Sequence, residues 1–248
     1  YEIPLRLVGS EMCIRDSMET DEVCDCPLEA ANMSSLKEKS TQFTPKKNTD
    51  FPMFSRTTKG ATHTMPILRG KNVLLRPYRR SDLPGILSWT NDTEATRYLT
   101  EIFDQPYTEK NGEDFLNYAL SGGSERMMFV MADPVTEEYW GQISLERISR
   151  RDGTAEVGVV LAKEEHRGKG IGREALSLLL RYAFDTLGLR RVELTVFAEN
   201  SRARLCYLKA GFIEEGVARQ KTWKNGKFHD VVSMAVLRDE WAKREEQA

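Results

Sequence analysis

A glycine-rich turn at His166–Arg173 is the stretch of this sequence whose residue types and spacing most clearly suggest chemistry. Its sequence is His-Arg-Gly-Lys-Gly-Ile-Gly-Arg, and it leads directly into an apolar segment, 175–180, that is typical of a helix. Glycines at a helix start leave backbone N–H groups accessible at the positive end of the helix dipole. Because such a turn can bind phosphate, we expect a ligand that bears phosphate groups.

Three phosphate-binding motifs could account for this turn. A Walker loop requires Ser or Thr directly after Gly-Lys, and neither follows here. A dinucleotide fingerprint accepts Ala175 in place of its third glycine, but the next strand has Glu193 in its middle and no acid at its end. The third motif is Arg-x-x-Gly-x-Gly at Arg167, Gly170 and Gly172. An ordinary turn at the start of a helix is the alternative that stays open.

The segments around the turn predict the elements that position it. A β-branched strand precedes it at 156–162, and its helix ends near Gly188. A further strand at 191–197 and a helix at 201–210 follow. The whole pattern predicts an α/β (α+β) domain over residues 65–242 with a mixed, mostly antiparallel sheet, and a C-terminal tail at 243–248. Other predicted elements are strands at 73–78, 127–132, 139–148, 212–222 and 228–237, and helices near 83–89 and 109–120.

Composition excludes several classes of protein. The chain has 248 residues, 40% of them apolar, and no apolar run approaches the length that spans a membrane. Lys and Arg balance Asp and Glu beyond residue 64, which argues against a nucleic-acid binder. Only Cys206 of the four cysteines lies in the predicted domain, so no internal disulfide is expected. We therefore expect a cytoplasmic protein without membrane or nucleic-acid partners and without a metal site.

The first 64 residues differ in character from the rest. The string Glu11–Ser17 matches a translated transposase mosaic end, so residues 1–17 are interpreted as a translated adaptor artefact. The authentic start is then Met18, Met33 or Met65. Residues 18–64 are rich in Ser, Thr, Lys, Asn and Asp and lack periodicity, which predicts a disordered N-terminal tail.

A second stretch makes the interpretation specific. Asn200 precedes a predicted helix, Tyr207 follows seven residues later, and Gly211-Phe212 ends it. Together with the turn one strand earlier, this resembles the two acetyl-coenzyme A signatures of the GNAT acetyltransferase superfamily. The segments 68–77 and 223–230 are similar to the branch that contains ribosomal-protein and spermidine/spermine N-acetyltransferases. The resemblance covers residues 66–240.

The resemblance implies a fold and a cofactor site. The fold would be a GNAT sheet flanked by helices, with two splayed strands that hold acetyl-CoA as co-substrate. The backbone of one splayed strand would pair with the pantetheine arm, the glycine turn would bind the pyrophosphate, and two further residues would contact the arm. These residues are, in that order, Val159, Val160 and Leu161; Arg167, Gly168, Lys169, Gly170, Ile171, Gly172 and Arg173; and Asn200 and Ala203.

Tyr207 is the implied general acid. A phenol with a pKa of about 10 can return a proton to a thiolate whose conjugate acid has a pKa of about 8.5. The alternative is an aromatic side chain on the buried face of helix 201–210, with Leu205 and Leu208 as neighbours. Cys206, one position away, is expected in the core, so no acyl-cysteine intermediate is expected.

Glu156 is the implied general base. Primary amines have a pKa near 10, so a base or a water chain must remove a proton from the acceptor at neutral pH. Glu156 begins the strand that would face the cofactor, where several relatives of the resembled family keep a carboxylate. The alternative is a glutamate at the sheet edge that is paired with Arg150 or Arg151.

A short acidic segment is the candidate site for the acceptor amine. The segment Phe103–Tyr107 resembles the acidic substrate loop of spermidine/spermine acetyltransferases, so Glu101, Asp104 and Tyr107 are the predicted substrate-binding residues. The alternative is a solvated loop of ordinary acid content.

The predicted function is therefore direct acetyl transfer from acetyl-CoA to a primary amine. The acceptor would be a polyamine, another small amine or a protein N-terminus. A non-catalytic acyl-CoA-binding module or sensor is the alternative, and a nucleotide-binding P-loop protein is a third, disfavoured one. Because members of the resembled family often dimerise, a homodimer is also expected.

Overall fold

The computed structural model describes residues 65–245 of the chain. The predicted adaptor segment (1–17) and the predicted disordered tail (18–64) lie outside the described residues, as do residues 246–248. Within the described part, the last helix, α6 (Arg238–Glu245), extends beyond residue 242, where the sequence analysis ends the domain.

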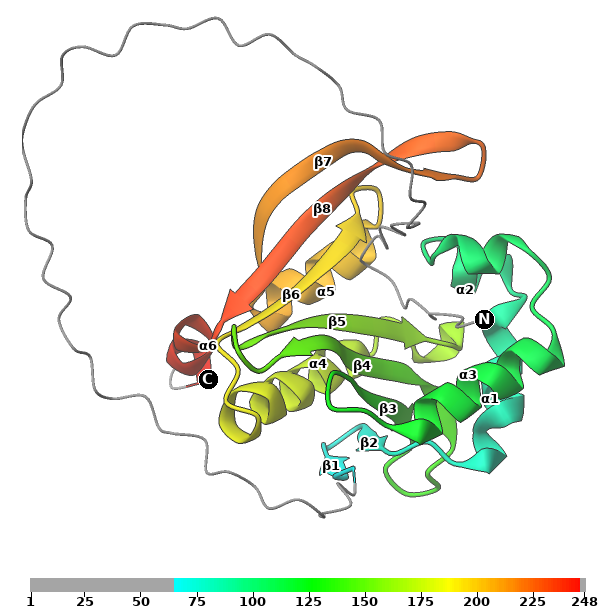
Figure 1. The fold of residues 1–248 in the computed structure, drawn as a ribbon, viewed down its shortest axis with the longest axis horizontal. Helices are drawn as coiled ribbons and strands as arrows, with labels where there is room; N and C mark the ends of the chain where they lie inside the picture. The colour runs from blue at the N-terminus through cyan, green and yellow to red at the C-terminus, as the bar shows by residue number, and fades with distance from the viewer. Residues whose placement is uncertain (1–64, 246–248) are drawn as a thin grey trace, which may run out of the picture. The chain divides into compact units, whose positions relative to one another are not determined.

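An eight-stranded sheet with the strand order β1-β2-β3-β4-β5-β6-β8-β7 forms the centre of the described residues (Figure 1). All neighbouring pairs are antiparallel except β5 and β6, which are parallel. The prediction of a mixed, mostly antiparallel sheet flanked by helices is therefore confirmed. The strands are β1 (Leu68–Arg69), β2 (Leu74–Arg76), β3 (Met127–Ala132), β4 (Tyr139–Ser149), β5 (Thr154–Leu161), β6 (Arg191–Phe197), β7 (Ile213–Lys224) and β8 (Lys227–Leu237).

Helices cover both faces of the sheet. Apolar residues of α4, α5 and α6 form one buried cluster with alternate residues of the strands, and those of α1 and α3 form a second cluster on the other face. No helix among residues 65–245 is long and apolar enough to cross a membrane. The helices are α1 (Leu83–Thr90), α2 (Thr93–Thr96), α3 (Glu109–Ser121), α4 (Ile171–Arg181), α5 (Ser201–Ala210) and α6, with 3-10 turns at Arg80–Asp82, Glu101–Asp104 and Glu164–His166 and a π-helical turn at Tyr182–Thr186.

The two helices that follow the predicted signatures begin at the expected residues, but α4 ends at Arg181 and a π-helical turn, Tyr182–Thr186, completes the stretch predicted to end near Gly188. Helix α4 starts after Gly170, whose φ of 83° lies in the left-handed region that favours glycine. Helix α5 starts after Asn200, whose side chain accepts a hydrogen bond from the Ala203 N–H group. It ends at Gly211, with φ 107°, as a glycine C-cap does. Local sequence therefore determines where both helices begin and where α5 ends.

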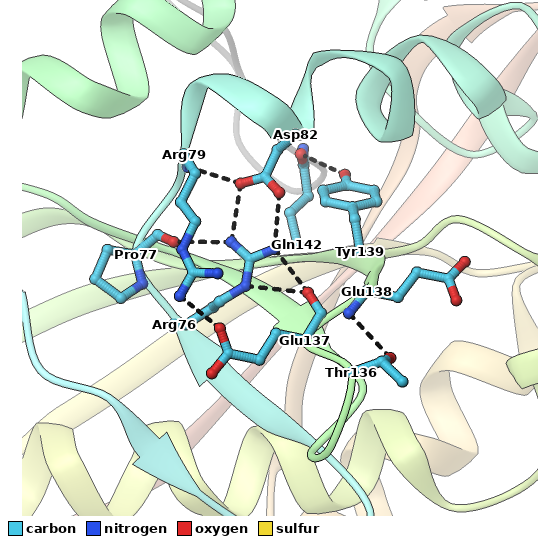
Figure 2. Close-up of polar contacts among 9 residues, drawn as sticks. All are labelled: Arg76, Pro77, Arg79, Asp82, Thr136, Glu137, Glu138, Tyr139 and Gln142. Atoms are coloured by element: carbon cyan, nitrogen blue, oxygen red, sulfur yellow. Dashed lines mark hydrogen bonds and ion pairs between the residues drawn. The ribbon is translucent and has the colours of Figure 1, made fainter.

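A buried ion pair joins strand β2 to the start of α1 (Figure 2). The Arg76 guanidinium donates to both carboxylate oxygens of Asp82, at 2.9 and 2.7 Å, and both side chains are nearly inaccessible. The same guanidinium donates to the Glu137 carbonyl oxygen at 3.0 Å, in the turn between β3 and β4. A bidentate pair of this kind fixes geometry as well as neutralising charge, so it holds the α1 layer at a defined place on the sheet.

Candidate active site

The parallel strands β5 and β6 separate part of the way along their length. Their paired residues end at Glu156 and Glu193, although β5 continues to Leu161 and β6 to Phe197. Figure 1 shows the two strands diverging beyond this point. The predicted splayed strands are therefore present, and the gap between them opens toward the end of β5 that leads into the glycine turn.

One edge of β5 is left unpaired by this separation. Val159, Val160 and Leu161 pair on one side with Ile143, Gln142 and Gly141 of β4. On the side toward β6, no strand of residues 65–245 pairs with them. Since a strand directs backbone N–H and C=O groups to both sides, this edge can bind an extended, amide-bearing chain.

The glycine turn presents an open backbone at the start of α4. Gly168 and Gly170 have φ angles of 78° and 83°, and a Cβ atom at either would meet no heavy atom within 4 Å. No side chain caps the helix, so the N–H groups of its first turn remain available to a ligand. An exposed turn with uncapped N–H groups at the positive end of an eleven-residue helix suits a pyrophosphate.

Two side chains of this turn lie against the start of β4 and the end of β5. Arg167 makes long hydrogen bonds to the carbonyl oxygens of Leu161 and Ala162, at 3.4 and 3.5 Å. The His166 ring stacks on Trp140, with 4.4 Å between ring centroids. Burial lowers the pKa of His166, which favours the neutral ring.

Asn200 and Ala203 contact each other at the start of α5. The Asn200 Oδ1 atom accepts from the Ala203 N–H group at 3.2 Å. Within the part of the chain that the structure describes, the Asn200 NH2 group makes no hydrogen bond. This amide can therefore donate to a ligand that enters beside β6, whereas the Ala203 N–H group is already used for capping.

Tyr207 projects from α5 into the cluster beneath the sheet. Its side chain is only 5% exposed, and its ring contacts that of Phe212 edge-on, with 5.9 Å between the ring centroids. Leu205 and Leu208, the neighbours expected for a purely structural tyrosine, are instead exposed at 56% and 40%. Burial raises the pKa of the Tyr207 phenol, so the hydroxyl stays protonated at neutral pH and is a weaker acid than an exposed phenol.

Glu156 lies where the strands begin to separate, and its carboxylate has a cationic partner. That partner is Arg147 of β4, not Arg150 or Arg151 as the sequence alternative proposed. Arg147 has a φ of 46° at an irregularity in the β4–β5 register, and a β-bulge of this kind redirects a side chain. The bulge directs Arg147 onto the carboxylate of Glu156.

Glu146 is a second carboxylate that sequence reasoning missed. Its Cα is paired directly with that of Glu156, so the two side chains lie on the same face of the sheet. The Ser144 hydroxyl donates to Glu146 at 3.0 Å, and burial raises the pKa of the Glu146 carboxyl. The alternation of Gln142, Ser144 and Glu146 along a predicted strand was the signal that could have indicated a polar row on this face.

The three predicted acceptor residues are not brought together as one acidic site. Asp104 is 2.5 Å from the Lys224 ammonium, a pairing 120 residues apart in sequence. Glu101 is exposed on the neighbouring 3-10 turn. Tyr107 is buried, its hydroxyl donates to the Asn111 carbonyl oxygen at 3.1 Å, and burial raises its pKa to about 12. No local pattern in the sequence indicated Lys224.

The fold and this site together define a class of protein. The unpaired edge of β5 and the uncapped start of α4 fit a ligand that combines an amide-bearing arm with phosphates, as acetyl-CoA does. The family described as "Acetyltransferase (GNAT) domain" matches residues 72–213. The chain therefore belongs to the GNAT family of acetyltransferases. It is an acetyl-CoA-dependent N-acetyltransferase.

Individual relatives agree with this assignment. The chain is 31% identical over 173 residues to spermidine N(1)-acetyltransferase of Vibrio cholerae serotype O1, covering 69% of this chain and 96% of the relative. It is 35% identical over 95 residues to the ribosomal-protein-serine acetyltransferase of Escherichia coli K12, covering 38% of this chain and 52% of that protein. A crystal structure of the Vibrio cholerae enzyme with CoA and spermine superposes with a TM-score of 0.62 at 28% identity, over 70% of this chain and 99% of the other. None of these relatives supports the alternative of a non-catalytic acyl-CoA sensor.

Proposed function

We propose that this protein acetylates a primary amine by direct transfer from acetyl-CoA, with a polyamine, another small amine or a protein N-terminus as acceptor. The observation that supports this most strongly is the separation of β5 and β6 beside an uncapped, glycine-rich helix start. The relatives named for spermidine and for ribosomal-protein serine support an amine acceptor.

The cofactor side is assigned to backbone groups first. Val159, Val160 and Leu161 would hold the pantetheine arm along the unpaired edge of β5, and one of their N–H groups would polarise the thioester carbonyl. Residues 167–173 would bind the pyrophosphate, with Arg167 and Arg173 adding charge-assisted contacts. Asn200 would donate its free amide to the arm. Bound in this way, acetyl-CoA supplies an activated acetyl group.

The chemistry is assigned to two side chains. Glu156 removes a proton from the acceptor ammonium, directly or through water, so that the neutral amine can attack the thioester carbon. As the new C–N bond forms and the C–S bond breaks, Tyr207 gives its proton to the departing sulfur, and the second proton lost by the attacking nitrogen passes, directly or through water, to the Tyr207 phenolate and restores the phenol. The products are an N-acetylated amine and coenzyme A with a free thiol.

An amine panel tests this function. The full chain is mixed with acetyl-CoA and, in turn, spermidine, a monoamine and a short peptide with a free N-terminus, and free thiol is measured over time. Thiol release with at least one acceptor, together with the acetylated product seen by mass spectrometry, is the expected result. Binding of acetyl-CoA without turnover on any of the acceptors would contradict the proposal.

We also propose a homodimer. Strand β7 is the last strand of the sheet, and within the described residues one of its edges has no partner. Ile213 and Val217 on this strand are 52% and 56% exposed. An exposed edge strand with apolar side chains favours pairing with a second chain. Sedimentation velocity should give the mass of two chains, and a monomer at every concentration would contradict it.

A further inference from the structure

A pocket of about 480 Å³ lies where helix α2 and the following 3-10 turn meet the β7–β8 turn, and we call it the acceptor pocket. Its volume is in the range of pockets that bind small molecules or short peptide segments. Figure 1 shows α2 beside the tip of the β7–β8 hairpin. The residues that line it are Thr93, Glu94, Thr96, Arg97, Phe103, Asp104, Lys224 and Asn225.

Ring contacts link the neighbours of the pocket residues to Phe197, at the end of β6 beside the gap. Tyr98 follows the lining residue Arg97 in the sequence, and its ring contacts that of Phe197, with 5.9 Å between the ring centroids. Phe197 is the last residue of β6. The Nε2 atom of His229 lies 3.0 Å from the Lys224 carbonyl oxygen, and the His229 ring contacts Phe197 edge-on. An acceptor whose amine reaches the gap between β5 and β6 would therefore place its remaining part in this pocket.

Lys224 neutralises Asp104, the carboxylate that would otherwise attract a cationic substrate. Its side chain is only 4% exposed, and its ammonium lies 2.5 Å from Asp104 Oδ1 and 3.3 Å from the Thr100 carbonyl oxygen. A buried ammonium is costly unless it is paired, so this pairing with Asp104 is strongly held. Asp104 therefore offers no uncompensated negative charge to a substrate.

The other two charges of the pocket also balance. Glu94 lies on α2, and Arg97 directly follows that helix. The Glu94 carboxylate is 3.9 Å from the Arg97 guanidinium. The lining thus contains two acidic and two basic side chains. A polycation that enters the pocket would meet the buried ammonium of Lys224 and the guanidinium of Arg97 as well as the two carboxylates. The buried ammonium of Lys224 disfavours a second cation beside it, whereas Glu94 and Arg97, at 75% and 54% exposed, are screened by solvent and contribute little.

We propose that Lys224 is a specificity-determining residue that makes the acceptor a peptide N-terminus rather than a polyamine. This inference rests on the proposed function and names its substrate class. A peptide N-terminus has one positive charge, which is at the reacting amine, and its remaining amide groups are neutral. Such a chain fills the pocket without bringing a second cation against Lys224. The preference separates this chain from the relative named for spermidine.

The test compares two acceptors on the full chain and three variants. The acceptors are spermidine and a short peptide with a free N-terminus, an amidated C-terminus and no Lys, Arg or His. Lys224→Met keeps an apolar stem and exposes the charge of Asp104, whereas Asp104→Asn removes the negative charge that compensates the ammonium. Lys227→Met is the matched control, because Lys227 lies on the same turn but is exposed and paired with Glu199.

The wild-type protein should acetylate the peptide with a kcat/KM at least about tenfold above that for spermidine. This difference is the expected effect of repulsion between the Lys224 ammonium and one additional ammonium of spermidine. Lys224→Met should raise kcat/KM for spermidine about tenfold, and Asp104→Asn should lower it by a similar factor. The peptide value should change less than about threefold in Lys224→Met, and Lys227→Met should change neither.

Spermidine as the better wild-type acceptor, or an unchanged spermidine value in both Lys224→Met and Asp104→Asn, would overturn the inference while leaving the proposed function intact. Absence of turnover with every amine would instead contradict the proposed function itself. If Lys224→Met fails to fold, the Asp104→Asn arm decides, because Asp104 is 38% exposed and the oxygen of an isosteric amide can still accept a hydrogen bond from the Lys224 ammonium.

Discussion

Glu156 of β5 and Glu193 of β6 are the last residues at which the two parallel strands pair. Beyond them, β5 keeps its antiparallel contacts with β4 and β6 keeps its contacts with β8, so each strand remains supported on one side only. The gap between them is therefore a stable part of the sheet. It leaves the backbone that the proposed mechanism uses to hold acetyl-CoA, and it places Glu156 at its closed end.

The first prediction concerns the glycines of the phosphate turn. Gly172→Ala should fold normally, because a Cβ there would meet only the Cys206 sulfur, at an ordinary 3.7 Å. It should nevertheless weaken acetyl-CoA binding about tenfold by crowding the backbone N–H groups of the first helical turn. Gly170→Ala, at a φ of 83°, should in addition lower Tm by roughly 2–4 °C, the effect of about 1 kcal/mol of strain. Calorimetric titration and thermal unfolding measure the two effects, and unchanged affinity in both variants would count against the phosphate site.

The second prediction concerns Tyr207. Replacement by Phe should lower kcat by about 10²-fold or more while the affinity for acetyl-CoA stays unchanged, because only the proton donor is removed. Tyr182→Phe is the matched control, since Tyr182 is a partly buried phenol on the helix after α4 that contacts Phe129. Steady-state kinetics at several pH values make the measurement. As burial raises the pKa of Tyr207, no loss of kcat from phenol ionisation is expected below about pH 10. Equal kcat values for Tyr207→Phe and the wild type would remove this residue from the mechanism.

The third prediction concerns Glu156. Glu156→Gln should lower kcat/KM about 10²-fold near neutral pH, since the acceptor ammonium then lacks its base. The deficit should shrink as the pH approaches about 10, where the amine loses its proton to water. Glu193→Gln, the partner across the strand pair, is the control and should retain activity. A deficit of the same size at every pH would assign Glu156 a structural role instead.

The fourth prediction concerns Glu146 and stability. Burial raises the pKa of its carboxyl above the ordinary 4.5, so folding favours the protonated form. The stability that protonation contributes is present below that ordinary value and is lost as the pH rises through the raised pKa. Glu146→Gln should therefore raise Tm at neutral pH by roughly 2 °C, with a smaller gain near pH 4. Glu193→Gln breaks an ion pair with Arg191 and should give no such gain. A lower Tm for Glu146→Gln at neutral pH would mean that the ionised carboxylate stabilises the fold.

Most of the fold follows from local sequence. The Asn225-Gly226 turn, with φ angles of 50° and 79°, formed the predicted hairpin because few other residues accept these angles. The caps at Gly170, Asn200 and Gly211 placed α4 and α5 for the same kind of local reason. The π-helical turn at the end of α4 had no such signal, because it depends on how that helix packs.

The candidate site could be predicted only in part. The residues of the phosphate turn and Tyr207 are neighbours in short motifs, so their spacing is visible in the sequence. The Arg147–Glu156 pair depends on a β-bulge, and the Asp104–Lys224 pair joins residues that are 120 positions apart in the sequence. No local sequence pattern encodes either pair. Those pairs change what the carboxylates can do. Asp104 is the clearest case, because the sequence alone suggested an acid open to a cation.

The most direct test of the account is the distance between the Tyr207 hydroxyl oxygen and the sulfur of coenzyme A in a crystal structure of the complex. We expect a pantetheine arm paired with Val159–Leu161 and a Tyr207 hydroxyl within about 3.5 Å of the sulfur, which is hydrogen-bond reach. An arm bound elsewhere, or a hydroxyl directed away from the sulfur by more than about 5 Å, would contradict the account.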